Sequence, residues 1–210
     1  MSQKICHAEL REKTQQLLQG ALKHVRTAAL AAVLVPLGAV TVSPSVALAQ
    51  ASGGVPSPCD FVTSGGFVVT DMSARANFGA HGGCKNGAFT GNVNYVDHGI
   101  GLHVAGFVIT GYLFSGSNTR DICGMATTNT SANPVKFRVR LIDNGEPGTT
   151  DAFGIRFIDS SGTVYLVTTR TLGGGRPGGG NIDLHAPNPS TVGPDPAPNE
   201  ATMCNGVDAP

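Results

Sequence analysis

Hydrophobic and polar residues alternate along much of the chain between residues 61 and 185. A period of two residues is typical of a strand with one buried face and one exposed face. The residues predicted to face the core in the three clearest segments are Phe137, Val139, Leu141; Phe153, Ile155, Phe157; and Val164, Leu166. Segments rich in aromatic and β-branched residues predict strands over 61–70, 74–80, 88–96, 101–110, 121–128, 135–143, 152–158, 162–171 and 181–185.

No segment between 59 and 185 keeps apolar residues at helical spacing for three turns, and glycine occurs throughout. The predicted strands are joined by turn sequences such as Asp143-Asn144-Gly145 and Ser160-Ser161-Gly162. These features predict one all-β domain over 59–185, an antiparallel β-sandwich or barrel of about 8–9 strands.

The first 49 residues have the pattern of a secretory signal peptide. Basic residues precede the apolar run 28–42, and a small-x-small cleavage sequence ends at Ala49. The run is shorter than the roughly 20 residues that a spanning helix needs, and Pro36 interrupts it, so a retained membrane anchor is the weaker alternative. We therefore expect cleavage near Ala49, or after Ala51, and a secreted, extracellular protein without a membrane segment after cleavage.

After the predicted leader, the charge balance limits the possible partners, and the composition changes at both ends of the predicted domain. From Gln50 onward there are nine Lys or Arg and twelve Asp or Glu, without a basic run, which argues against nucleic acid as a partner. Lys136, Arg138 and Arg140 alternate with apolar residues and are interpreted as the solvated face of a strand. Residues 50–58 are predicted to be a flexible N-terminal segment, and 186–210 a Pro-rich C-terminal tail.

Four cysteines follow the leader, Cys59, Cys84, Cys123 and Cys204. An even number in an exported chain predicts two disulfides, for which three connectivities are possible. We favour Cys84 with Cys123, and Cys59 with Cys204, because Cys204 would then tie back a tail that nothing else holds. The spacing does not match a zinc ribbon, so metal-bound thiolates are a minor alternative.

Five segments occur in an order that resembles a known family: VTSGGF at 62–67, ANFG at 76–79, GNVNYVDHGIGLHVAGFVITGY at 91–112, DNGEPGTTDAFGI at 143–155 and GGGNIDLH at 178–185. In this order and spacing the chain resembles the post-COAP domain family, small secreted prokaryotic domains of undetermined function. The resemblance covers about residues 62–185 and implies an exported all-β domain, but no catalytic residues. Ser64 departs from the family pattern, which has glycine there.

The DNGEPG motif permits two interpretations. Asp143, Asn144, Glu146 and Asp151 gather hard oxygen ligands within nine residues, which fits a calcium site, although the spacing is not that of an EF-hand. Turn chemistry is the favoured explanation, with an Asx-turn at Asp143 or Asn144 and positive φ at Gly145. Apart from possible calcium, no cofactor is expected.

Other catalytic or ligand-binding chemistry has weaker support. His98, His103 and His185 could form a three-histidine metal site only if the fold brings them together. Glu146 is the one glutamate between 59 and 185, and no Gly-x-Ser-x-Gly elbow occurs. The glycine-rich stretch 173–180 lacks the lysine of a phosphate loop and is a connector or a recognition loop.

These observations predict an extracellular binding, adhesion or structural module, and not a catalyst, whose ligand is an unidentified polysaccharide or protein. The alternative class is a calcium- or metal-dependent extracellular hydrolase. An enzyme would show a cleft into which acidic or histidine side chains converge, whereas a binding module would show a ligand surface without one.

Overall fold

A computed structural model describes residues 50, 52–162 and 164–210. The strands are β1 (Phe61–Val69), β2 (Arg75–Lys85), β3 (Ala88–Asp97), β4 (Leu102–Gly116), β5 (Thr119–Thr128), β6 (Val135–Ile142), β7 (Ala152–Ile158), β8 (Val164–Thr171) and β9 (Gly180–His185), and a short helix, α2, spans Glu200–Cys204. The prediction of an all-β antiparallel fold is confirmed. Within the described part of the chain, no helix is long and apolar enough to cross a membrane.

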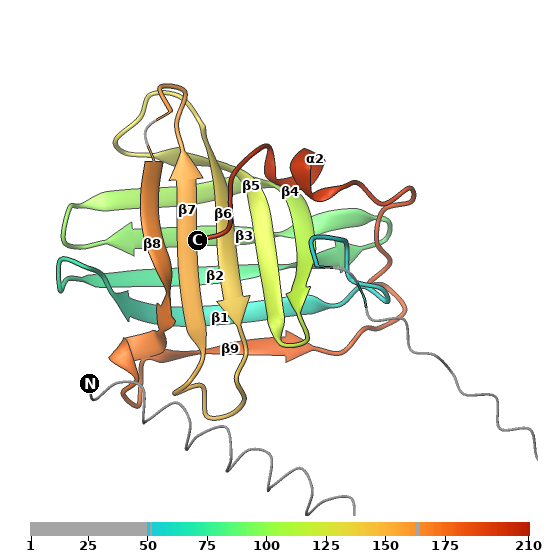
Figure 1. The fold of residues 1–210 in the computed structure, drawn as a ribbon, viewed down its shortest axis with the longest axis horizontal. Helices are drawn as coiled ribbons and strands as arrows, with labels where there is room; N and C mark the ends of the chain where they lie inside the picture. The colour runs from blue at the N-terminus through green and yellow to red at the C-terminus, as the bar shows by residue number, and fades with distance from the viewer. Residues whose placement is uncertain (1–49, 51, 163) are drawn as a thin grey trace, which may run out of the picture. The chain divides into compact units, whose positions relative to one another are not determined.

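All nine strands belong to one antiparallel sheet with the order β8-β7-β6-β5-β4-β3-β2-β1-β9. Except for β9, each strand pairs with its neighbours in the chain, so the sheet is a meander. β6, β7 and β8 cross steeply in front of β1, β2, β3 and β9 (Figure 1). The sheet therefore curls into a half-barrel whose two ends face each other across one core.

The curl is produced in β4, the longest strand. Its pairing with β5 shifts register three times, between Gly106 and Val108, between Ile109 and Gly111, and between Phe114 and Gly116. Such irregularities bend a strand and increase its twist. Aromatic contacts across the core confirm the closure, because Phe78 of β2 stacks on Phe153 of β7 with ring centroids 3.9 Å apart.

The alternation in β6 and β7 is confirmed, since Phe137, Val139, Phe153 and Ile155 are fully buried. The prediction for β8 is wrong, because Leu166 is 37% exposed. Register explains the error: Val167 lies opposite the inward-facing Ile155, and Leu166 lies opposite Arg156.

The predicted disulfide pairing is also wrong. Cys59 bonds to Cys84, and Cys123 bonds to Cys204. The β1–β2 register explains the first bond, because Phe61 pairs with Gly83 and this places Cys59 beside Cys84. The second bond does hold the C-terminal tail, but to β5.

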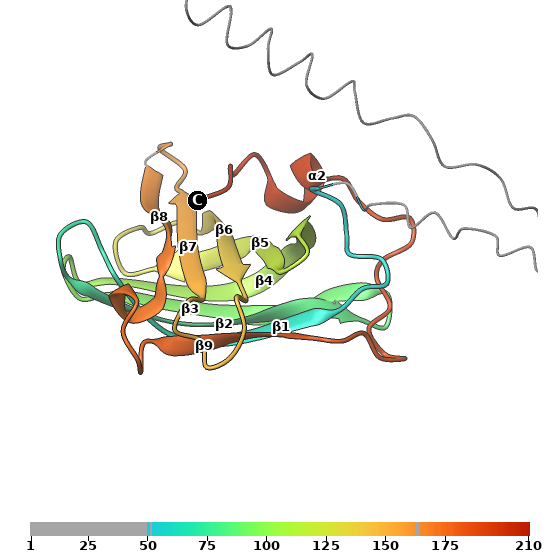
Figure 2. The same ribbon diagram turned by 60° about the horizontal axis from the view of Figure 1, so that its bottom comes forward.

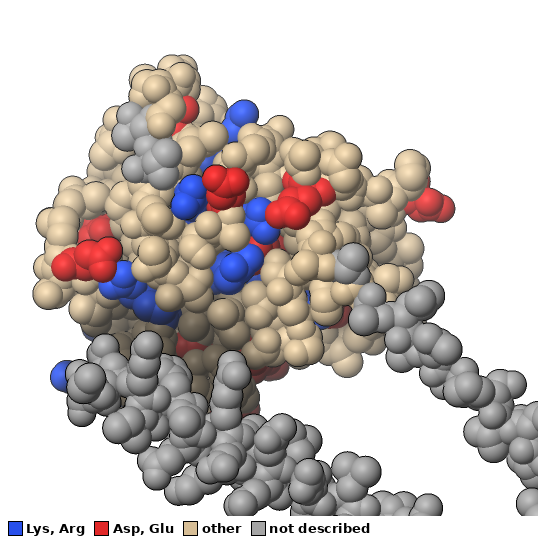
Figure 3. All heavy atoms as spheres, viewed as in Figure 1, with Lys and Arg blue, Asp and Glu red and all other residues tan. Residues whose placement is uncertain are grey.

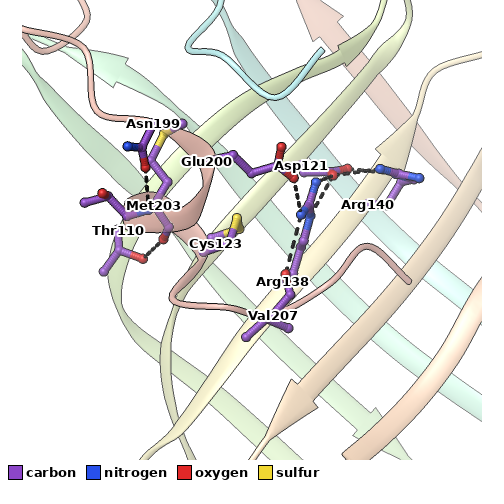
Figure 4. The surroundings of a disulfide bond; sticks show 11 residues. Thr110, Asp121, Cys123, Arg138, Arg140, Asn199, Glu200, Met203 and Val207 are labelled. Carbon is purple, nitrogen blue, oxygen red and sulfur yellow. Dashed lines mark hydrogen bonds and ion pairs between the residues drawn. A yellow bond between two sulfur atoms is a disulfide. The ribbon is translucent and has the colours of Figure 1, made fainter.

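The C-terminal segment packs on the outside of β4, β5 and β6 (Figure 4). Asn199 caps α2 by accepting a hydrogen bond from the Thr202 amide at 2.9 Å, and Met203 is fully buried. This segment covers Arg138, which is only 5% exposed, so its assignment to a solvated strand face is wrong.

At the other end of the described domain, Gly53 and Gly54 exchange backbone hydrogen bonds with Phe114.

The only three tyrosines of the chain have polar partners in the interior. The Tyr165 hydroxyl donates to Asp97 at 2.6 Å, the hydroxyls of Tyr95 and Tyr165 lie 2.7 Å apart, and the Tyr112 hydroxyl donates to Asp60 at 2.7 Å. Burial raises the pKa of Tyr95 to about 12. Burial, together with Asp60 for Tyr112 and Asp97 for Tyr165, raises the other two pKa values as well.

Stability should therefore decrease in alkaline solution. The folded state keeps tyrosine protons that the unfolded chain releases near its ordinary pKa of about 10. The contribution is complete below pH 10 and is lost progressively as the pH rises toward 12, the pKa of Tyr95. In a titration followed by tyrosinate absorbance and circular dichroism, ionisation should accompany unfolding. A tyrosine that ionises near pH 10 while the circular dichroism stays native would contradict this.

Candidate functional site

The DNGEPG loop connects β6 to β7 and contains the four residues predicted as calcium ligands. One oxygen of Asp143 accepts a hydrogen bond from the Gly145 amide at 2.8 Å, where φ is 90°, as the turn interpretation requires. Its other oxygen accepts from the Leu184 amide of β9 at 2.9 Å. Asp143 therefore joins the loop to the edge of the sheet.

Asp151 makes a parallel connection from the end of the same loop. Its carboxylate is completely buried and accepts from the amides of Asn144 at 2.8 Å and Ile182 at 2.7 Å. The amides of alternate β9 residues point away from β1, so Asp143 and Asp151 replace the neighbouring strand that β9 lacks. The motif thus closes the sheet edge.

The other two predicted ligands have partners in the same region. Glu146 accepts from the Asn181 side chain at 2.8 Å, and the Asn144 side chain donates to the Thr150 carbonyl at 2.7 Å. Calcium binding here stays a prediction, which a higher melting temperature in calcium than in EDTA would support.

The histidines predicted as a possible metal site are not brought together. His185 lies on β9 and His103 on β4, with β1, β2 and β3 between them. Among the residues with described placement, no group of three or more His, Cys, Asp or Glu side chains is arranged to hold a metal ion.

A different region has the features of a ligand site. The side of β9, β1, β2, β3 and the first half of β4 that faces away from the core is covered neither by α2 nor by another strand of the described chain, as Figure 2 shows beneath these strands. We call it the outer face. Its side chains, read from the alternation and register, are Phe61, Thr63, Phe67, Val69; Arg75, Asn77, His81, Lys85; Ala88, Thr90, Asn92, Asn94, Val96; His103, Ala105; Asn181, Asp183 and His185.

Neutral polar groups dominate this face. Asn92 and Asn94 are connected by a side-chain hydrogen bond, and the side-chain NH2 group of Asn92 also donates to the Gly106 carbonyl at 3.3 Å. Phe107, which follows at the β4 bulge, is 56% exposed. Arg75 lies over the ring of Phe67, 3.9 Å from its centroid, so an aromatic group and a cation occupy one side of the face.

One end of the outer face is hollowed into a pocket of about 290 Å³. Side chains from three strands and a loop of the C-terminal segment line it: Phe61, Thr63, His81, Lys85, Thr90, Asn188 and Ser190. We call it the Phe61 pocket. Phe61 stacks on His185 with ring centroids 4.4 Å apart, and His185 is held by a 2.8 Å hydrogen bond to the Thr63 hydroxyl.

Two devices hold the pocket in shape. The Cys59–Cys84 disulfide connects the chain just before β1 to the end of β2, the two strands that form its walls. The C-terminal wall is fixed by backbone hydrogen bonds from Asn86 to the Ser190 carbonyl and from Gly87 to the Val192 carbonyl. A ligand would therefore meet preplaced donors and acceptors, which lowers the entropic cost of binding.

The opposite face of the molecule differs in chemistry. Charged side chains of both signs lie close together there, over β5 to β8 and the C-terminal segment (Figure 3). Asp121, Arg138 and Glu200 form ion pairs with N–O distances of 2.6 Å. These charges satisfy one another, so this face offers less to an external ligand.

Sequence reasoning missed the outer face because exposed strand residues have the ordinary pattern of solvated positions. A signal was present in Gly65 and Gly79, because each places a glycine inside a predicted strand. Only the register shows that these two glycines lie opposite each other.

The fold and this pocket define an all-β, disulfide-stabilised half-barrel domain with an open sheet face. No family model, no curated protein and no solved structure matches the chain.

Proposed function

We propose that this protein is an extracellular glycan-binding module and that the Phe61 pocket is its binding site. The observation that carries the proposal is the combination, in one preformed pocket, of a partly exposed aromatic ring with uncharged hydrogen-bonding groups such as Thr63, Thr90 and Asn188. An aromatic ring can contact the C–H face of a sugar, while Asn, Thr, Ser and His can each donate to or accept from hydroxyl groups.

The charges of the outer face favour an uncharged, hydroxyl-rich ligand. Arg75, Lys85 and Asp183 are its charged residues, and they are spread over two strands, β2 contributing two and β9 one. This is too little cationic charge to attract a polyanion. Two disulfides and the predicted leader support an oxidising, extracellular location, where polysaccharides are abundant.

The proposal is tested by pelleting the oxidised protein, residues 50–210, with insoluble cellulose, chitin, xylan, β-glucan and peptidoglycan. At least one of them should deplete the protein from solution. Phe61→Ala and His81→Ala should each weaken binding several-fold, since an aromatic or hydrogen-bonding contact contributes about 1 kcal/mol.

Leu166→Ala is the matched control, because Leu166 is an exposed apolar residue on β8, away from the pocket. It should bind like the native protein. If none of the polysaccharides binds, or if Phe61→Ala and Leu166→Ala bind equally well, the proposed function is wrong.

A further inference from the structure

A strip with few side-chain atoms crosses the outer face next to the Phe61 pocket. Gly65 of β1 pairs directly with Gly79 of β2, and the row continues through Asn94 of β3 to Ala105 of β4. Asn94 bonds to Asn92 in its own strand, so its side chain leans out of the row. We call this row the bare strip.

The fold does not require glycine at either position. A methyl group built on Gly79 would meet nothing within 4 Å, and one built on Gly65 would only just reach the Phe78 carbonyl oxygen at 4.0 Å. Neither residue has a positive φ. Glycine weakens a strand interior, so two unneeded glycines side by side indicate that something outside the domain approaches the backbone there.

The residues beside the strip provide polar and apolar walls. Thr63 and His81, which also line the Phe61 pocket, stand on one side, and Phe67 and Asn77 stand on the other. Side chains two residues along a strand from the strip lie about 6.6 Å away on each side, which leaves a lane wide enough for a single extended chain.

The strip leads to a second depression. A hollow of about 360 Å³ lies over β3, β4 and β5 and is lined by Asn94, His103, Ala105, Thr127 and Asn129, among others. Ala105 belongs both to this hollow and to the strip. From β1 to β5 the distance is roughly 19 Å, four strand spacings of about 4.8 Å.

We infer that the ligand is an internal stretch of a linear polysaccharide, which runs across the strands from the Phe61 pocket, over Gly65 and Gly79, to the hollow at His103. This inference rests on the proposed function and specifies its ligand. A protein partner is less consistent with the strip, because the centre of a protein interface is typically filled by large apolar or aromatic side chains.

The test uses oligosaccharides, from dimer to octamer, of the polysaccharide that the protein binds, with affinities measured by calorimetry. For the native protein, affinity should rise with length until the chain reaches the hollow. Gly79→Val should bind the dimer as the native protein does but lose at least tenfold in octamer affinity. Its melting temperature should be equal or higher, because valine favours strands and has room.

The control variants and the alternative outcomes distinguish a folding defect, a wrong binding site and a different kind of partner. Gly79→Ala, which adds only a methyl group, should show a smaller loss in the same direction, and Leu166→Ala should show none. Equal affinity for dimer and octamer, or unchanged octamer binding by Gly79→Val, overturns the extended-chain inference and leaves the pocket proposal standing. A failure of every sugar to bind, with a native dimer in sedimentation that Gly79→Val dissociates, overturns both in favour of self-association.

Discussion

Asp121→Ala should lower the free energy of unfolding by about 3–5 kcal/mol, the range measured when one partner of a buried ion pair is removed. The Asp121 carboxylate is completely buried and bonds to two guanidinium groups, Arg138 at 2.6 Å and Arg140 at 2.8 Å. Its hydrogen bond also raises the pKa of Arg140. Without Asp121, the buried Arg138 keeps an ion pair with Glu200, and that residue is half-exposed.

Urea unfolding of the oxidised protein measures this effect. Asp121→Asn retains one acceptor and should fall between the native protein and Asp121→Ala. Asp208→Ala is the matched control, because Asp208 is 85% exposed and its pair with Arg156 spans 3.3 Å, so its loss should change stability by less than about 1 kcal/mol. Equal effects of Asp121→Ala and Asp208→Ala would show that the buried network does not stabilise the fold.

Removal of the Cys123–Cys204 disulfide by the double substitution Cys123→Ala/Cys204→Ala should lower the free energy of unfolding by about as much as Asp121→Ala does. The bond joins residues 81 positions apart, and constraint of the unfolded chain over such a loop is worth about 4.5 kcal/mol in the chain-entropy model. Locally, α2 should separate from β4 and β5. Without the disulfide, its polar attachment to β4 is the hydrogen bond from the Thr110 hydroxyl to the Met203 carbonyl at 2.5 Å.

The second disulfide provides the comparison. Cys59–Cys84 closes a loop of 25 positions. Cys59→Ala/Cys84→Ala should therefore lower the free energy of unfolding by about 1 kcal/mol less than Cys123→Ala/Cys204→Ala does. Hydrogen exchange adds a local measurement, since amides of 199–207 should lose protection only in the variant without Cys123 and Cys204. Unchanged protection there would mean that packing alone holds the C-terminal segment.

The strands were predictable because alternation is a local property of the chain. The predicted strand ends were wrong mainly where glycine lowers strand propensity. β2 continues to Lys85 and β4 to Gly116, although the prediction ended these strands at residues 80 and 110. Those extensions depend on pairing with a neighbouring strand, and propensity does not contain that information.

The disulfides and the ligand surface were not predictable for a related reason. Cys123 meets Cys204 only because the C-terminal segment folds back over β5, and Gly65 meets Gly79 only in one register. The DNGEPG motif attracted a metal interpretation because carboxylates close in sequence suggest a shared ion. In the fold, Asp143 and Asp151 instead reach separate amides of β9.

Those two carboxylates also limit how copies of the domain can join. The sheet has two edge strands, β8 and β9, and a strand from another molecule could add to β9 only by displacing Asp143 and Asp151 from the Leu184 and Ile182 amides. Growth into a fibre needs two receptive edges on every subunit. With β9 blocked, pairing through β8 would stop at two molecules, so crowding would produce closed pairs instead of filaments.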